Sequence, residues 1–477
     1  MPDRIVGDAA DGLRRTSPSV QGVDAGGVLA FLDDVERAGL ELHSLMLWRD
    51  GAVVAEGFHW PYGATRLRMA HSMTKSVTAC AIGLLIDAGR LSLDDRIVTF
   101  FPEVSLPEDA PARRITVEHL LTMRTGHDVE VSGSIWRGIE TSWVEEFFRI
   151  PIVHEPGTTH VYSSAASYML SAIVTRVTGE TIHAFLEPRL FAPLGMQGTR
   201  WDVGPDGINP GGNGISFTMA DGVKLGILHA QRGRWDGRQI LPEWWVDAAT
   251  RGHGVPDYGY HWVVGDTYYA ALGVFVQMVI VYPEQNAVLG IHGAMKESKV
   301  LLPHLKRHFP ACFGQAGSAV ADQQLAARLA GWAQPPALVS AAAGDPHAFA
   351  GCWAAAPNDV DVTRIAIGFD GGDLHLAFDD ETGRHELSAP RDAWRETRTS
   401  LAGGALHHGY AMENAPTVAG WRWLSADRIE LTCRFVESAF HDTFVIARTA
   451  EGLTLDRAVN INSGARAWPT LRGSPAA

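Results

Sequence analysis

Cysteine is scarce in this 477-residue chain, and its placement argues against two kinds of site. The four cysteines are scattered and form no C-x-x-C pair: Cys80, Cys312, Cys352 and Cys433. Zinc sites and disulfide scaffolds use closely spaced or paired cysteines, so we expect reduced core thiols instead. The twenty histidines include no H-E-x-x-H spacing, and the pair His407-His408 stands in a glycine-rich turn region. We therefore predict no metal site.

Basic residues and long apolar runs are also few. Forty Lys and Arg residues against 54 Asp and Glu residues give a formal net charge of −14. Because no basic run stands out, nucleic acid and an anionic membrane are disfavoured as partners. No run of about 18 apolar residues occurs that could span a membrane. Residues 1–20 also lack the apolar core of a signal peptide, so we expect a cytoplasmic protein.

Hydrophobic residues make up 46% of the chain, enough for a sizeable core, and the length suggests two or three domains. Residues 42–60 predict two strands joined by a turn at Asp50-Gly51. Helical periodicity extends from about 70 to 200, and strands return in 258–293, where "PEQN" indicates a turn. Strands at both ends with helices between them predict an α/β (α+β) fold.

The last third of the chain has a different pattern. Residues 313–345 are rich in alanine and end in proline and glycine, which predicts a helix and then a linker. Short alternating strands follow around turns such as "DGGD", which predicts a separate antiparallel β barrel or sandwich. We therefore divide the chain into a domain of residues 1–312, the linker 313–345 and a C-terminal β domain of residues 346–477.

A candidate nucleophile stands at the start of a long apolar helix. The stretch "HSMTKSVTACAIGLLIDAG" places Ser72 and Lys75 three positions apart, so both side chains could point to one face. A serine needs a base within hydrogen-bond reach, and burial would favour a neutral Lys75 that accepts its proton. The helix N-terminus would supply N–H groups where an oxyanion develops. Because the pattern is short, the alternative is that Ser72 only caps the helix and that Lys75 has no catalytic role.

A second candidate lies downstream. Tyr162 precedes a helix in "HEPGTTHVYSSAASYMLSAIVTRVTG", where the turn at Pro156-Gly157 could present the hydroxyl to a cleft, although an isolated tyrosine often packs. Together the two stretches resemble the serine β-lactamase and penicillin-binding-protein superfamily. The most similar branch contains class C β-lactamases, family VIII carboxylesterases, D-amino-acid peptidases and 6-aminohexanoate-dimer hydrolases. "ITVEHLLTMRTGH", "LFAPLGM" and "RGRWDGRQILP" follow the family order within residues 25–305.

The resemblance implies a β-lactamase-like antiparallel sheet flanked by helices, with an inserted helical subdomain and a C-terminal lipocalin-like barrel. It also implies that Ser72 is the acylated nucleophile, Lys75 its proton partner and Tyr162 a general base or proton shuttle. Which of Lys75 and Tyr162 takes the proton stays open. No metal or organic cofactor is implied.

The chain departs from the family at two motifs. Ser164 replaces the asparagine of Y-x-N, and the third motif, K-T-G or H-x-G, falls at Ala271-Leu272-Gly273 without a cation. This loss disfavours substrates that end in a carboxylate, so an ester or a neutral amide fits better. Gly273 still permits close approach of the backbone. The resemblance implies that the N–H groups of Ser72 and Val274 form the oxyanion hole.

Four further residues are weaker candidates. Trp136 and Trp143 could wall an acyl pocket or could equally cover the core. Asn213 in "GGNGIS" could reach the cleft, whereas a phosphate loop is disfavoured because the Lys-Ser/Thr pair is lacking. We interpret His292 as a structural histidine at a strand end.

The sequence therefore predicts a serine hydrolase that cleaves a small ester, amide or short peptide through an acyl-enzyme. Acyl transfer on the same fold, D-amino-acid peptidase or weak β-lactamase activity, and a catalytically inactive binding module are the alternatives. The substrate, the role of the β domain and homo-oligomer formation stay open, because they depend on loop shape and surface.

Overall fold

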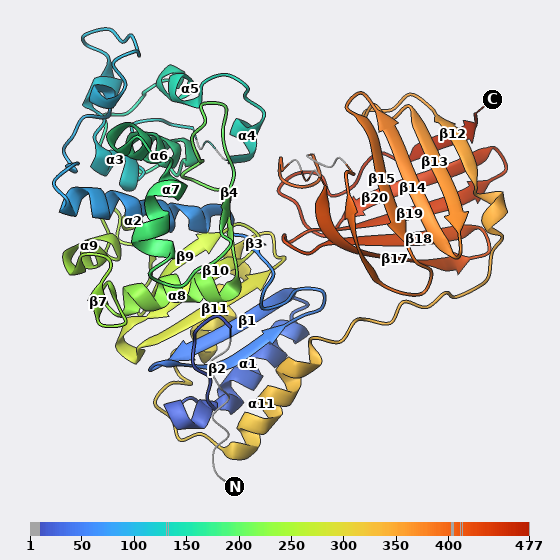
Figure 1. The fold of residues 1–477 in the computed structure, drawn as a ribbon, viewed down its shortest axis with the longest axis horizontal. Helices are drawn as coiled ribbons and strands as arrows, with labels where there is room; N and C mark the ends of the chain where they lie inside the picture. The colour runs from blue at the N-terminus through green and yellow to red at the C-terminus, as the bar shows by residue number, and fades with distance from the viewer. Residues whose placement is uncertain are drawn as a thin grey trace. The chain divides into compact units, whose positions relative to one another are not determined.

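The computed structural model describes residues 10–129, 131, 133–401, 405–410, 412 and 414–476. The first nine residues, part of the segment in which we expected no signal peptide, lie outside the described residues. The chain forms two compact units: Met1–Phe58 with Ala64–Trp332, and His59–Gly63 with Ala333–Ala477. Each unit has a sheet of its own (Figure 1).

The first unit is built on a six-stranded antiparallel sheet with the order β2-β1-β11-β10-β9-β8. Asp50 and Gly51, with φ of 45° and 91°, form the tight turn predicted between the first two strands. "PEQN" joins β10 to β11, as also predicted. The strands are β1 (Leu42–Arg49), β2 (Ala52–Phe58), β8 (Val263–Val264), β9 (Tyr269–Gly273), β10 (Gln277–Tyr282) and β11 (Ala287–Gly293).

Helices cover both faces of this sheet (Figure 1). Successive residues of β10 enter two different cores: Met278 belongs to one apolar cluster and Val279 to the other. Because β10 is buried on both faces, its sequence is a continuous apolar run rather than an alternating one. The covering helices are α1 (Ala25–Arg37), α10 (Leu302–His308) and α11 (Ala319–Gly331) on one face, and α8 (Met219–Ala230) on the other.

A group of helices and two small sheets form the rest of the first unit, and the helical group is what the resemblance implied. Its central helix α2 (Thr74–Asp87) is buried nearly all round and ends before Gly89, whose φ of 66° suits a helix stop. This helix packs against α6 (Ser164–Thr178), which also contacts α3 and α5. The remaining elements are α3 (Val117–Leu121), α4 (Gly133–Arg137), α5 (Trp143–Arg149), α7 (Ile182–Leu186), α9 (Glu243–Ala249), β3 (Arg68–Met69), β4 (Arg200–Trp201), β5 (Ile215–Phe217), β6 (Arg234–Trp235) and β7 (Arg238–Gln239).

The second unit is a ten-stranded antiparallel sheet with the order β15-β14-β13-β12-β21-β20-β19-β18-β17-β16. Thr399 Oγ1 on the last strand donates to Glu386 O on the first at 2.7 Å, so the sheet is nearly closed into a barrel. This confirms the predicted C-terminal antiparallel barrel. The strands are β12 (Gly351–Ala355), β13 (Arg364–Asp370), β14 (Asp373–Asp380), β15 (Gly383–Ala389), β16 (Arg395–Thr399), β17 (Ala415–Ser425), β18 (Arg428–Phe435), β19 (His441–Thr449), β20 (Gly452–Val459) and β21 (Leu471–Pro475).

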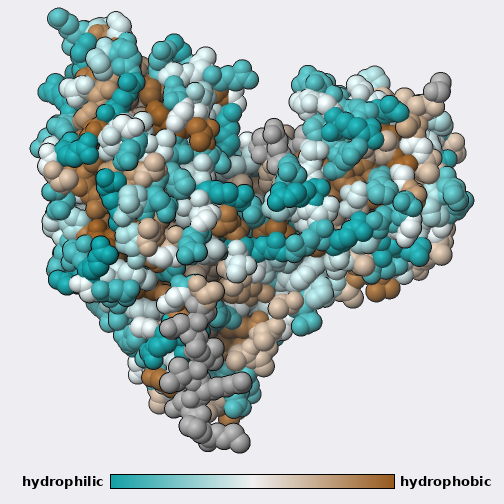
Figure 2. Space-filling view, in the orientation of Figure 1, coloured by the Kyte–Doolittle hydropathy of each residue, from teal (hydrophilic) through white to brown (hydrophobic). Residues whose placement is uncertain are grey.

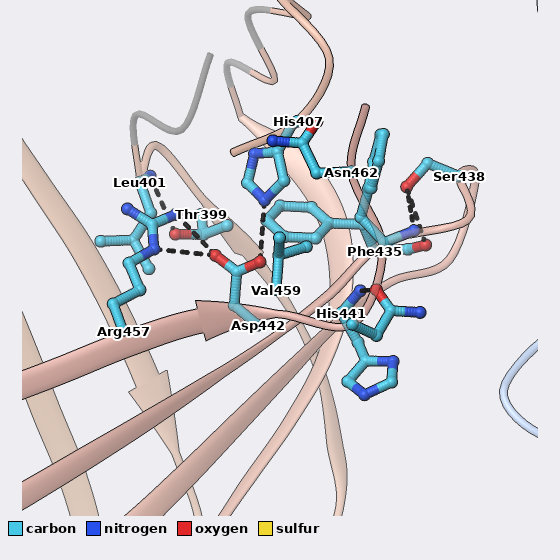
Figure 3. Close-up of polar contacts among 12 residues, drawn as sticks. Thr399, Leu401, His407, Phe435, Ser438, His441, Asp442, Arg457, Val459 and Asn462 are labelled. Carbon is cyan, nitrogen blue, oxygen red and sulfur yellow. Dashed lines mark hydrogen bonds and ion pairs between the residues drawn. The ribbon is translucent and has the colours of Figure 1, made fainter. Parts of the chain in front are cut away.

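A buried ionic cluster lies inside this barrel (Figure 3). Asp442 accepts hydrogen bonds from Arg457 Nε at 2.9 Å and Nη2 at 2.6 Å, and from His407 Nε2 at 2.8 Å. Burial acts to raise the pKa of Asp442, but Arg457 and His407 hold it below its usual value. The predicted turn region around His407 therefore contributes a partner to a core carboxylate.

Figure 2 shows a surface on which hydrophilic and apolar residues are interspersed. This agrees with a chain whose large apolar side chains are mostly buried within the two units. Across the described ranges, no helix is both long and apolar enough to cross a membrane.

Candidate active site

Ser72 lies in the short 3-10 turn η2 (His71–Met73), which leads directly into α2. Thr74 Oγ1 donates to His71 O at 2.6 Å, and Met73 N donates to Ala70 O at 3.2 Å, so the turn is held from within. Ser72 is half-buried, whereas His71 and Met73 are buried. The serine predicted at a helix start is therefore presented by a fixed turn just before the helix.

Lys75 joins three separate stretches of the chain. Its Nζ donates to Ser72 Oγ at 3.1 Å, to Ser164 Oγ at 3.0 Å and to Gly212 O at 2.8 Å. Only 2% of Lys75 is exposed, and a buried amine requires such partners. The structure thus brings together three predicted residues, Ser72, Lys75 and Ser164, and adds the Gly212 carbonyl, which the sequence analysis missed.

This arrangement suits proton transfer. As an ammonium group, Lys75 has three N–H donors for the three surrounding oxygens. As a neutral amine it has two N–H groups for Ser164 and Gly212 and a lone pair for the hydroxyl proton of Ser72. Both forms fit the same positions of the heavy atoms, so a proton can pass between Ser72 and Lys75 along the existing 3.1 Å contact.

Tyr162 faces Lys75 with its ring. The Nζ atom of Lys75 lies 4.7 Å from the ring centroid, within the range of a cation–π contact. Tyr258 packs edge-on against Tyr162 with ring centroids 6.3 Å apart. Burial, and next the charge that Tyr162 can carry, raise the pKa of Tyr258 well above its usual value. Tyr258, for which the sequence offered no signal, is therefore neutral and packs against the predicted Tyr162.

His261 is a further residue that the sequence analysis missed. It is buried, and its φ of 61° is left-handed, which is uncommon for a residue with a side chain. Its Nε2 lies 3.1 Å from Ser167 Oγ, and its carbonyl accepts a hydrogen bond from Ser76 Oγ at 2.7 Å. Burial, and then the positive charge of Lys75, lower the pKa of His261 to about 3. It therefore stands beside the site as a neutral imidazole.

The end of β9 lies against the turn that carries Ser72. A Cβ atom at Gly273 would come within 2.3 Å of Ala70 O and 3.2 Å of His71 Cβ, so only glycine permits this approach. Val274 follows and lines the same cleft as Ser72. Gly273 thus has the close backbone contact that the sequence analysis expected.

The cleft around Ser72 has a volume of about 340 Å³. Lys296 and Glu297, two charged residues that the sequence analysis did not select, contribute to its wall. Both are exposed, and Glu297 forms an ion pair with Lys299. The full lining is Ser72, Lys75, Tyr162, Tyr258, His261, Val263, Ala270, Leu272, Gly273, Val274, Lys296, Glu297 and Ser298.

The third-motif position lies at the edge of the cleft, and His292 lies near the end of a strand, as the sequence suggested. Leu272 and Gly273 edge the cleft and supply no cation there. His292 sits within β11, and its Nδ1 lies 3.1 Å from Ser44 Oγ. Burial, followed by the charge of Arg68, lowers the pKa of His292 well below its usual value.

Trp136 and Trp143 pack into the helical core. Their ring centroids lie 5.8 Å and 5.1 Å from that of Tyr168, and 5.7 Å from each other. Both are nearly buried, and among the described residues neither belongs to the cleft lining. Of the two expected roles, the structure favours covering the core.

Asn213 is buried next to the Gly212 carbonyl, and its own carbonyl accepts a hydrogen bond from Trp201 Nε1 at 3.2 Å. It lies outside the described lining of the cleft. The preceding Gly211 O accepts from Thr78 Oγ1 at 2.8 Å, so the glycine-rich loop is tied to α2. Within the described part of the chain, no group of three or more His, Cys, Asp or Glu residues could hold a metal ion.

A family model described as Beta-lactamase matches residues 30–293, more than half of the chain. The chain therefore belongs to the beta-lactamase family, which confirms the resemblance. The match contains Lys75 and the residues that surround it in the turn before α2, at the start of α6 and in the glycine-rich loop.

Relatives of this chain include an uncharacterized protein of Mycobacterium tuberculosis (strain CDC 1551 / Oshkosh), 35% identical over 164 residues, which are 30% of this chain and 40% of the relative. The lovastatin esterase of Penicillium rubens is 32% identical over 148 residues, which are 26% of this chain and 37% of that enzyme. The chain thus covers about two fifths of these relatives. A crystal structure of a penicillin-binding-protein homologue from Caulobacter crescentus has the same fold, with a TM-score of 0.50 and 18% identity over 63% of this chain and 99% of that one.

Proposed function

We propose that this protein is a serine hydrolase that cleaves a small ester or amide through an acyl-enzyme on Ser72. The observation that carries this proposal is the position of Lys75 Nζ, 3.1 Å from Ser72 Oγ and held by two further oxygens. A hydroxyl with a buried amine in hydrogen-bond contact has the base that a serine nucleophile requires.

In the proposed reaction, Ser72 Oγ attacks the substrate carbonyl while its proton passes to the Lys75 and Tyr162 pair. The N–H groups of Ser72 and Val274 stabilise the oxyanion. Tyr162 delivers a proton to the leaving group and then helps to activate the water that hydrolyses the acyl-enzyme. Val274 adjoins Gly273, whose close packing on Ala70 supports this assignment.

Acyl transfer to an alcohol or amine is a second outcome of the same acyl-enzyme. It differs from hydrolysis only in the final acceptor, so product analysis with added alcohols separates the two. An inactive binding module would form no acyl adduct, although the cleft would still bind ligands.

The test compares wild type, Ser72→Ala and Lys75→Ala in stopped-flow turnover of p-nitrophenyl butyrate, with intact mass of the quenched protein. We expect an acyl adduct in the wild type, nearly complete loss in folded Ser72→Ala, and a loss of several orders of magnitude in Lys75→Ala because the two residues act as a unit. Ser298→Ala is the matched control, since Ser298 also lines the cleft. Full turnover by Ser72→Ala would refute the proposal.

A further inference from the structure

The turn that follows Val274 is strained. Phe275 and Val276 have φ of 63° and 66°, the left-handed region that residues with side chains rarely adopt, and for the β-branched Val276 this is a clear outlier. Both side chains are fully buried. Such a conformation persists only where surrounding contacts hold it, and here it immediately follows Val274.

Two buried polar side chains provide those contacts. Gln277 Nε2 donates to Phe275 O at 3.1 Å and to Gly293 O at 3.2 Å. Arg68 Nε donates to Gln277 Oε1 at 2.9 Å. Because a guanidinium group has donors only, it fixes the amide oxygen of Gln277 toward itself and leaves the NH2 group for the two carbonyls.

Arg68 is itself held in place. Its Nη2 donates to Gly293 O at 3.1 Å and to His43 Nδ1 at 2.8 Å, and His43 Nε2 then donates to Glu41 Oε1 at 2.9 Å. Arg68 is 3% exposed and Gln277 is fully buried. A buried guanidinium is costly without such partners, so this network has one preferred arrangement.

The network links the two halves of the proposed oxyanion hole. Arg68 stands four residues before Ser72 and belongs to β3, whereas Gln277 stands three residues after Val274 and begins β10. We propose that Arg68 and Gln277 form a positioning pair that sets the N–H of Val274 against Ser72. This inference rests on the proposed function and concerns geometry, since neither side chain belongs to the described cleft lining.

The test uses the full chain with Gln277→Glu, Gln277→Met and Arg68→Lys. Glu keeps an oxygen for Arg68 but loses both N–H donors, and Met keeps the volume without any donor. We expect kcat for p-nitrophenyl butyrate to fall about ten- to hundredfold, somewhat less than loss of a whole oxyanion donor, while KM stays within about twofold. Inhibition by phenylboronic acid, whose tetrahedral adduct uses the same site, should weaken in parallel with kcat.

The matched control is Ser44→Ala, which removes a buried hydrogen bond to His292 but keeps the hydrogen bonds of Gln277 to Arg68, Phe275 and Gly293. We expect this control to lower thermal stability but to keep kcat. Gln277 and Arg68 variants that lose only stability and keep kcat would overturn the inference, and if one variant does not fold, the others decide. Absence of a Ser72 acyl adduct in the wild type would instead refute the proposed function, so the two failures are distinguishable.

Discussion

Lys296 is a positive charge in the wall of a cleft that belongs to a chain with a net charge of −14. The third-motif position at Leu272 and Gly273 has no cation, but Lys296 can attract an anionic group from a different part of the wall. Its neighbour Glu297 forms an ion pair with Lys299, which offsets part of the negative charge of Glu297.

We therefore expect Lys296→Ala to lower kcat/KM for the anionic ester p-nitrophenyl hemisuccinate by about two- to fivefold, the size of an exposed charge interaction. The neutral p-nitrophenyl butyrate should be unaffected, and 0.5 M NaCl should remove the difference by screening. Lys306→Ala, which changes the net charge equally at an exposed position outside the described lining, is the control. Equal losses in both variants would contradict a local role of Lys296.

At the scale of elements, the glycine-rich loop fixes the orientation of Lys75. A Cβ atom at Gly211 would lie 2.2 Å from Ser167 O and 3.0 Å from Ser171 Cβ, so the loop packs directly on α6. Thr78 Oγ1 ties the same loop to α2, and Gly212 O accepts from Lys75. The loop, α2 and α6 therefore position one amine together.

We expect Gly211→Ala to lower the free energy of unfolding by about 1–3 kcal/mol, as overpacking does. Turnover should also fall, because the loop must move away from Lys75 to make room for the added Cβ atom. Urea unfolding and p-nitrophenyl butyrate kinetics measure the two effects. Gly331→Ala at the end of α11 is the control, since its added Cβ meets nothing within 4 Å. Unchanged turnover in a destabilised Gly211→Ala protein would show that the loop does not orient Lys75.

At the scale of the whole molecule, the proposed site and the buried ionic cluster belong to different compact units. Ser72 and Lys75 belong to the first unit, whereas the carboxylate of Asp442 lies with Arg457 and His407 inside the barrel of the second. The stability of the barrel and the chemistry of the site should therefore respond to different substitutions.

Asp442→Asn leaves the buried Arg457 without its carboxylate and should destabilise the second unit by about 3–5 kcal/mol. Calorimetry should show a lower unfolding temperature for that unit, while turnover at 25 °C stays within about twofold because Ser72 and Lys75 belong to the other compact unit. Asp456→Asn makes the same chemical change at an exposed position of β20 and is the control. A comparable shift in the control would argue against a special role of the buried pair.

Much of this arrangement follows from local sequence. Helical periodicity places residues three apart on one face, so the contact of Ser72 with Lys75 could be predicted without knowledge of any distant residue. Strand and turn patterns predicted the β1–β2 hairpin and the barrel for the same reason, because alternation and turn chemistry act within a few residues. The sequence motifs shared with the family then identified Tyr162 and Ser164 as candidate site residues.

Other features depended on segments that meet only in the folded chain. Gly212 O lies 137 residues from Lys75 in sequence, and Gln277 lies 209 residues from Arg68, so no periodicity connects either pair. Tryptophan is common both in pocket walls and in protein cores, so residue type alone could not decide the role of Trp136 and Trp143. Their packing on Tyr168 favours the core. Sequence supplies the reactive groups through short-range geometry, whereas long-range packing fixes what surrounds and orients them.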